Sequence, residues 1–133
     1  MTLMPAWANA ENNANQKLNK MMNFFPRFIR RLAANSKNKD GVTQLMVAAK
    51  EGETRILMRM IEAGGDVNAK DKDGITALMF AAARGRTDCV KVLLAVGADL
   101  NAKDKWGHTA IMAAKVGAKD DAVAALKAAG AKD

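Results

Sequence analysis

Apolar and polar positions follow one another in the same order three times along this chain, at a constant spacing of 33 residues. The order is clearest around Gly74, which is followed by Thr76, Leu78 and Ala81. The same or a similar residue type stands 33 positions before and after each of them, as Gly41, Thr43, Leu45 and Ala48 and as Gly107, Thr109, Ile111 and Ala114. A fixed period of this size predicts an array of repeats, in which each unit buries its apolar side only against its neighbours.

A polar turn and a short helix open each unit. Residues 70–74, Lys-Asp-Lys-Asp-Gly, form the turn, and Thr76 follows as a helix N-cap whose hydroxyl can accept an unpaired backbone N–H. We expect Leu78 and Ala81 on the buried side of this helix, where small alanines let another helix approach closely. Gly85 is expected to end the helix, because glycine tolerates the left-handed conformation that closes many helices.

A second helix is expected from roughly Asp88 to Val96, with Gly97 ending it. Its apolar residues have the i, i+1, i+4, i+5 spacing of a single helix stripe, which is typical of an element with one buried face. The stripe consists of Cys89, Val90, Leu93 and Leu94. Cys89, the only cysteine, is therefore expected to be a buried core thiol and not a reactive one.

The repeated unit resembles the ankyrin repeat. The matching pieces are Asp-Gly-Ile-Thr-Ala-Leu-Met at 73–79, Val-Lys-Val-Leu-Leu at 90–94 and Gly-Ala-Asp-Leu-Asn-Ala at 97–102. The resemblance covers residues 35–133 and implies an all-α solenoid, in which each unit has a β-turn finger and two antiparallel helices.

One departure from the family pattern concerns its Thr-Pro-Leu-His turn. Methionine stands at the histidine position in all three units, as Met46, Met79 and Met112. This loses a hydrogen-bonding group between turns and adds an adaptable apolar side chain. We therefore expect the same fold with somewhat less rigid turns.

The register divides the chain into five parts. These are residues 1–10, a signal-peptide remnant or disordered tail; 11–34, an N-terminal helical cap or degenerate repeat; 35–67, 68–100 and 101–133, the three repeats, the last with the C-terminal cap.

Both ends of the array look specialised. Lys127 stands where Ile61 and Leu94 stand in the earlier units, and a lysine there suits a face on which no further repeat stacks. At the other end, residues 24–29, Phe-Phe-Pro-Arg-Phe-Ile, align with residues 56–61. Pro26 within this segment favours a helix that starts or kinks there. We expect a closed array and a monomeric protein.

Most of the net charge of +7 belongs to the N-terminal segment. Residues 1–39 hold seven basic residues and one acidic residue, whereas residues 40–133 hold 14 basic and 13 acidic residues. A uniformly basic face for nucleic acid is not indicated. The apolar residues among Arg27, Arg30 and Arg31 could cap the first repeat, which we favour, or form a membrane-surface helix.

Residues 8–10, Ala-Asn-Ala, have the small-x-small form of a signal-peptidase site, and a polar stretch opens at Glu11. The basic and long apolar regions of a full signal peptide are missing. Two interpretations stay open: the end of an export signal, which would place the protein in a bacterial periplasm, or an ordinary alanine-rich terminus of a cytoplasmic protein.

Catalytic chemistry is not indicated. The chain has one histidine, no tyrosine, and no zinc-protease, serine-hydrolase or phosphate-loop motif. The turn at residues 71–74 superficially resembles a calcium loop, but Ala69 and Phe80 occupy two required ligand positions. Its carboxylates are better explained by local hydrogen bonding in the turn. We expect no enzyme activity, no cofactor and no metal.

The resemblance implies a protein-binding surface formed by the finger tips and first helices. Transferred to this chain, the positions are Lys39, Asp40, Val42, Lys50, Glu51, Lys72, Asp73, Ile75, Ala83, Arg84, Lys105, Trp106, His108 and Val116, with Phe80 as a further candidate. Lys39, Lys72 and Lys105 form a column that could meet acidic groups of a partner or simply be a solvated edge. Trp106 could anchor a partner or fold back onto the neighbouring finger.

The sequence thus predicts a non-catalytic protein-interaction module. Our first hypothesis is an inhibitor or immunity-type protein that occludes a periplasmic enzyme. The alternatives are a cytoplasmic scaffold or regulatory subunit, and a surface-associated protein that uses its basic N-terminal segment.

Overall fold

A computed structural model describes residues 27–132, with side chains from residue 31 onward. Seven α-helices form the regular structure of this part, and its only β contact is an isolated antiparallel bridge between Lys37 and Thr43. The predicted all-α class is confirmed. The helices are α2 Arg27–Ala34, α3 Gln44–Glu51, α4 Thr54–Glu62, α5 Ala77–Arg84, α6 Thr87–Ala95, α7 Ala110–Val116 and α8 Asp120–Ala128.

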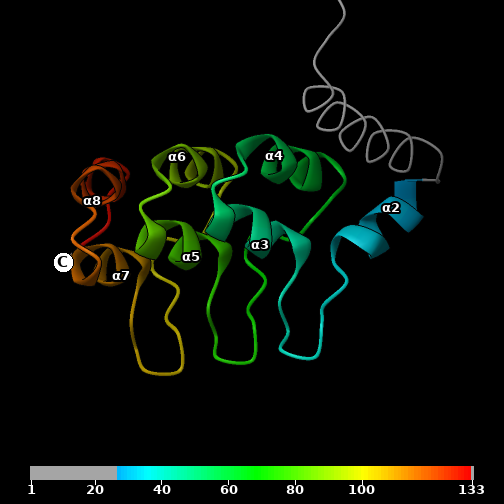
Figure 1. Ribbon diagram of the computed structural model, residues 1–133, viewed down its shortest axis with the longest axis horizontal. Coiled ribbons are helices and arrows are strands. Elements are labelled where there is room, and N and C mark those ends of the chain that lie inside the picture. Colours follow the sequence, from blue (N-terminus) through cyan, green and yellow to red (C-terminus); the bar gives the residue numbers. More distant parts are fainter. Residues whose placement is uncertain (1–26, 133) are drawn as a thin grey trace, which may run out of the picture.

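The helices of residues 44–128 are stacked in two rows (Figure 1). We call α3, α5 and α7 the inner helices and α4, α6 and α8 the outer helices; within each row, successive helices pack on one another. Three long loops project in one direction from the inner row (Figure 1). We call them the fingers and define them as residues 36–43, 69–76 and 102–109.

Small residues bring the inner helices close together. Ala49, Ala81, Ala82 and Ala114 are completely buried, as the sequence predicted for Ala81. Larger aliphatic residues fill the space between the two rows, and each repeat supplies equivalent ones: Leu45, Leu78 and Ile111 from the inner helices, and Leu57, Leu93 and Leu126 from the outer helices. The core is therefore a continuous seam between stacked units.

Threonine and glycine set the ends of the inner helices α3 and α5. The Thr76 hydroxyl accepts the Met79 N–H at 3.3 Å, and Thr43 accepts the Met46 N–H at 3.2 Å. Gly85 follows α5 with φ 69°, in the left-handed region. The predicted N-cap at Thr76 and the predicted stop at Gly85 are both confirmed.

Methionine contributes to these helix starts in a way that the sequence did not suggest. The Met46 sulfur accepts the backbone N–H of Thr43 at 3.5 Å, so the thioether recovers one hydrogen bond at this turn. Met46 and Met79 are also buried, 1 % and 5 % exposed. Methionine is therefore more than an apolar filler here.

The second helix of the middle repeat lies one residue earlier than predicted, at Thr87–Ala95. Cys89, Val90 and Leu93 are buried, whereas Leu94 is only partly buried at the edge of the stripe. The prediction of a core thiol is confirmed, since Cys89 is 1 % exposed. Its sulfur lies 3.6 Å from the Thr54 hydroxyl of the preceding repeat.

Two positions are more exposed in the third repeat than in the other two. Lys127 is exposed, whereas Ile61 and Leu94 at the same position are partly buried. Met112 is 37 % exposed, although Met46 and Met79 are buried. At the other end, Phe24, Phe25 and Pro26 lie outside the described residues, as do the side chains of Phe28 and Ile29, so capping of the first repeat by these residues stays a prediction.

Replacing Gly74 by alanine should destabilise the fold more than the same change at Gly107. Both have left-handed backbone, with φ 78° and 83°, so both changes introduce a strain of roughly 1–2 kcal/mol. At Gly74 the new Cβ would also lie 3.2 Å from the Asp104 Cα and the Lys105 nitrogen, whereas nothing lies within 4 Å at Gly107. Such crowding typically adds about 1–3 kcal/mol. Urea unfolding of both variants measures the difference, and equal midpoints would contradict close finger packing.

Candidate protein-interaction surface

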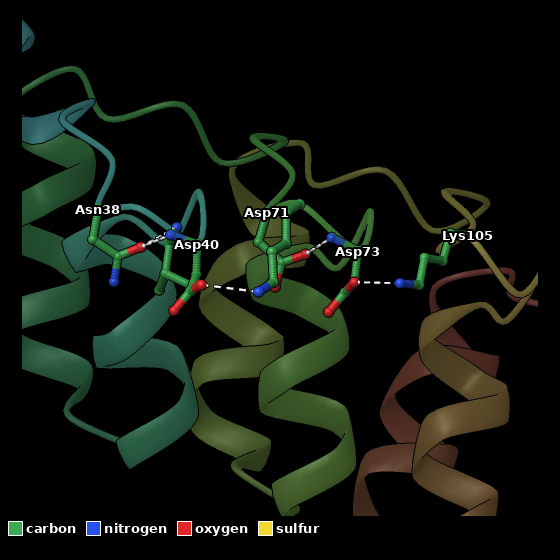
Figure 2. Close-up of polar contacts among 7 residues, drawn as sticks. Asn38, Asp40, Asp71, Asp73 and Lys105 are labelled. Atoms are coloured by element: carbon green, nitrogen blue, oxygen red, sulfur yellow. Dashed lines mark hydrogen bonds and ion pairs between the residues drawn. The ribbon is translucent and has the colours of Figure 1, made fainter.

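One polar side chain shapes the turn in each finger. In the second finger, an Asp71 carboxylate oxygen accepts the N–H groups of Asp73 and Ile75, at 2.8 and 2.9 Å (Figure 2). Asn38 in the first finger and Asp104 in the third each accept two N–H groups in the same way, at 2.9–3.0 Å. These hydrogen bonds confirm that the turn carboxylates serve the local backbone.

The Asp104 carboxylate is also held in its ionised form. Burial by itself would raise its pKa, but the N–H groups of His108 and Trp106 and the nearby His108 ring outweigh that effect and hold the pKa of Asp104 below its ordinary value. The His108 Nδ1 atom lies 3.4 Å from the second carboxylate oxygen. The third finger therefore has a fixed negative charge at its base.

Neighbouring fingers are joined by backbone and side-chain contacts of the same residue pair. The Lys72 N–H donates to the Asp40 carbonyl oxygen at 3.0 Å, and the Lys72 ammonium lies 2.9 Å from the Asp40 carboxylate. Lys105 repeats both contacts with Asp73, at 2.9 and 2.6 Å. Figure 2 shows the ion pair. The hydrogen bond and charge of Asp40 raise the pKa of Lys72 above its ordinary value.

These ion pairs change the interpretation of the lysine column. The sequence offered Lys39, Lys72 and Lys105 as three charges for a partner, but Lys72 and Lys105 are paired with Asp40 and Asp73 of the preceding finger. Of the column, only Lys39 forms no ion pair among residues 27–132. The pairing could not be seen along the sequence, because the paired residues are 32 positions apart.

Two further series of contacts link the repeats beside the fingers. The Asn35 side chain accepts the Asp66 N–H and donates to the Gly64 carbonyl oxygen, and Asn68 does the same with Asp99 and Gly97. The Lys37 and Lys70 ammonium groups donate to the carbonyl oxygens of Lys70 and Lys103, at 2.9 and 3.3 Å. Sequence reasoning missed these residues. Their 33-residue recurrence was the available signal.

Trp106 takes the finger position that Asp40 and Asp73 occupy in the other repeats. It is 59 % exposed, and the Lys105 ammonium lies 4.5 Å from the centre of its ring. Its ring is therefore covered in part by the preceding residue of the same finger, and much of the indole faces solvent. His108 is also exposed, in the position where Val42 and Ile75 pack against the core.

The inner helices present a mixed surface beside the fingers. Val47 is 40 % exposed and Val116 is 90 % exposed. Phe80 packs partly against the core, with the Lys50 ammonium 6.0 Å from its ring centre. Of the candidate residues, Lys39, Glu51, Lys72, Arg84, Lys105, Trp106 and His108 are exposed, and Asp40, Val42, Lys50, Asp73, Ile75 and Phe80 are partly buried.

Chemistry-bearing groups do not converge in the part of the chain that the structure describes. No three histidine, cysteine, aspartate or glutamate side chains in residues 27–132 are placed to hold a metal ion. An open pocket of about 310 Å³ lies at the helix junctions of the first two repeats, lined by Gly52, Thr54, Gly85, Arg86, Thr87, Asp88 and Cys89. Its one nucleophilic group is the buried Cys89 thiol.

The two helix rows, the three fingers and the seam of small residues define a helical-repeat solenoid. The family model for ankyrin repeats, described as three copies, matches residues 10–104. The chain belongs to the ankyrin-repeat family. No curated protein matches it.

The match and the structure extend over different parts of the chain. The match begins inside the segment that precedes the first finger, and it ends before α7 and α8, which continue both helix rows. No helix in residues 27–132 is long and apolar enough to cross a membrane. Ankyrin repeats are in general non-catalytic modules, and their presence makes this chain a protein–protein interaction module.

Asp104→Ala should destabilise the third finger, whereas Asp104→Asn should preserve it. Alanine removes the acceptor of two N–H groups, which should cost about 1–3 kcal/mol. Asn38 makes the same two bonds in the first finger, so an amide oxygen is an adequate acceptor. Urea unfolding at neutral pH compares the two variants with the wild-type chain.

The same pair of variants tests the acid dependence of stability. The folded-state pKa of Asp104 is lowered, so its ionised form stabilises the fold above the unfolded pKa of about 3.9. That stabilisation is lost as the pH falls through the lower, folded pKa. Thermal midpoints below pH 4 should fall less steeply for Asp104→Asn than for wild type. Parallel curves would show that the carboxylate contributes nothing to acid sensitivity.

Proposed function

We propose that this protein is an inhibitor or immunity-type module that binds an enzyme and covers its active site. The observation that supports this proposal is that each inner helix carries an apolar side chain that is exposed or only partly buried. We call these residues, Val47, Phe80 and Val116, the inner-helix strip. These side chains belong to three helices packed side by side. Apolar groups of this kind, with polar groups around them, are suited to the centre of a protein interface.

Rigidity of the fingers favours tight binding over loose contact. Each finger is fixed internally by the two hydrogen bonds of Asn38, Asp71 or Asp104. Each is fixed to its neighbour by a backbone bond and an ion pair. A surface that is ordered before binding loses little conformational entropy on association. Such fingers can block an active-site cleft without being displaced by substrate.

A periplasmic target follows from residues 8–10, Ala-Asn-Ala, if they mark the end of an export signal. These residues lie outside the described part of the chain, so this location rests on the sequence pattern. Mass spectrometry of the natural protein tests it, because a mature chain that retains Met1 excludes cleavage at this site.

A second candidate is a cytoplasmic scaffold that assembles two partners. The observation that favours it is exposed apolar surface on the outer row, where Met58 on α4 is 46 % exposed and Val96 at the end of α6 is 43 % exposed. A scaffold needs a second face of this kind, whereas an inhibitor needs only the inner one.

Val47→Asp and Met58→Asp form a matched pair that separates the two candidates. The two residues are similarly exposed, at 40 % and 46 %, and belong to an inner and an outer helix of the same repeat. Affinity capture with the full chain, followed by mass spectrometry, identifies the partner. Val47→Asp should then weaken its binding at least tenfold, or about 1.4 kcal/mol.

Met58→Asp should leave inhibition and affinity unchanged if the protein is an inhibitor. Loss of a second captured partner with Met58→Asp alone would favour the scaffold. Full inhibition by Val47→Asp would exclude the inner-helix strip as the binding surface. Circular dichroism of both variants checks that they remain folded.

A further inference from the structure

Three series of hydrogen bonds run from repeat to repeat and reach the third repeat. In the first, a finger carbonyl oxygen accepts an N–H from the next finger, as Asp40 and Asp73 do. In the second, the side chains of Asn35 and Asn68 bind the loop of the next repeat. In the third, the ammonium groups of Lys37 and Lys70 bind the next repeat's backbone. The next members are Trp106 in the first series, Asn101 in the second and Lys103 in the third.

These next members find no such partner within residues 27–132. The finger turn is nevertheless complete, since the Asp104 carboxylate accepts its two N–H groups and Gly107 has φ 83° like Gly41 and Gly74. A Cβ on Gly41 or Gly74 would lie 3.0–3.2 Å from the next finger, whereas nothing lies within 4 Å at Gly107. The third finger therefore presents an ordered, unpaired hydrogen-bonding edge.

Apolar surface accompanies this edge. Trp106 is 59 % exposed, and Met112 is 37 % exposed at the position where Met46 and Met79 are buried. We name the group Asn101, Lys103, Trp106, Gly107 and Met112 the end face. It combines one carbonyl acceptor, one amide, one ammonium donor and two apolar side chains.

The chemistry of the end face does not match another repeat of this type. Asp40 and Asp73 each pair with a lysine of the next finger, and Trp106 has no carboxylate for such a pair. Lys127 is exposed where the earlier repeats have partly buried Ile61 and Leu94. Stacking an apolar outer helix there would bury a charge, which is unfavourable.

Charge indicates what the end face does match. Residues 101–133 contain six lysines and four aspartates, whereas residues 35–67 contain five basic and five acidic residues. Asp104 is bound to the backbone of its own finger, and Lys105 is paired with Asp73 of the preceding finger. An acidic partner is therefore attracted to this end of the array more than to the other repeats.

We propose that the end face binds an acidic segment of a partner protein, whose backbone N–H pairs with the Trp106 carbonyl oxygen and whose apolar side chains pack separately on Trp106 and on Met112. The Lys103 ammonium meets a carboxylate of that segment. This inference rests on the proposed protein-binding function and adds to it a second contact, distinct from the inner-helix strip around Val47 and Phe80.

The test uses the full chain, labelled with ¹⁵N, and three synthetic peptides of equal length. Each peptide carries one leucine and one phenylalanine; the remaining residues are mostly Asp and Glu, Asn and Gln, or Lys. The acidic peptide should shift the backbone amide signals of residues 101–112 and the Trp106 indole signal. The peptide rich in Asn and Gln should bind at least tenfold more weakly than the acidic one, and the lysine peptide should give no shifts.

Variants locate the binding. Trp106→Asp restores the residue type of the first two fingers at an exposed position, and it should weaken the acidic peptide at least tenfold. Trp106→Phe keeps an apolar ring and should remain within about threefold of wild type. Lys103→Ala should weaken binding and reduce its salt dependence, whereas Lys39→Ala, an exposed lysine of the first finger, should change neither. Thermal unfolding checks that each variant is folded.

Four results would overturn the inference. They are no shifts with any peptide at millimolar concentration, shifts centred on Val47 and Phe80, stronger binding of the lysine peptide, or self-association through the same residues that Trp106→Asp abolishes. The last result would identify a second copy as the occupant.

Failure of the proposed function is distinguishable. If Val47→Asp leaves the natural partner's affinity unchanged while the acidic peptide still binds the end face, the inner-helix proposal is wrong and the end-face proposal stands.

Discussion

Close contact between successive fingers is the constraint that orders the finger surface of this protein. Gly41 and Gly74 lack a side chain where the next finger's backbone passes, so the fingers approach closely enough for a Lys N–H to reach an Asp carbonyl oxygen. The same approach brings each lysine ammonium onto the carboxylate of the preceding finger. Because each finger positions the next, the ridge of fingers is one ordered unit and not three separate loops.

The helices impose a complementary constraint. Ala49, Ala81, Ala82 and Ala114 are completely buried, and their small size lets the inner helices lie side by side. Larger side chains point between the rows, so each repeat gives its apolar surface to its neighbours. The surface that the inner row leaves exposed is mixed, and Val47 and Val116 are apolar side chains within it. In the proposed function, a partner protein contacts these exposed apolar side chains.

Charge in the fingers is largely used for contacts within the array, which changes how their surface should be understood. The fingers are rich in lysine and aspartate, yet Asp71 and Asp104 bind their own backbone, and Asp40 and Asp73 bind lysines of the next finger. Exposed ion pairs of this kind contribute little to stability individually. Because these charges are already paired, the ends of the array differ mainly in their exposed apolar groups and in a few unpaired polar groups.

The sequence by itself determined the repeat, the helix starts and stops at residues such as Thr76 and Gly85, and the local role of the turn aspartates. These features depend on residues within one unit, and residues that are close in sequence within a unit are also close in the fold. The sequence also indicated that Trp106 departs from the pattern, since the other two fingers have aspartate at this position. Only the tertiary structure decided that Lys72 and Lys105 are paired, that Asn35 and Lys37 bind across repeats, and that Met112 is exposed where Met46 is not. Those outcomes depend on how closely one repeat stacks on the next. The sequence within one unit does not reveal this distance, because the contacting residues belong to different repeats.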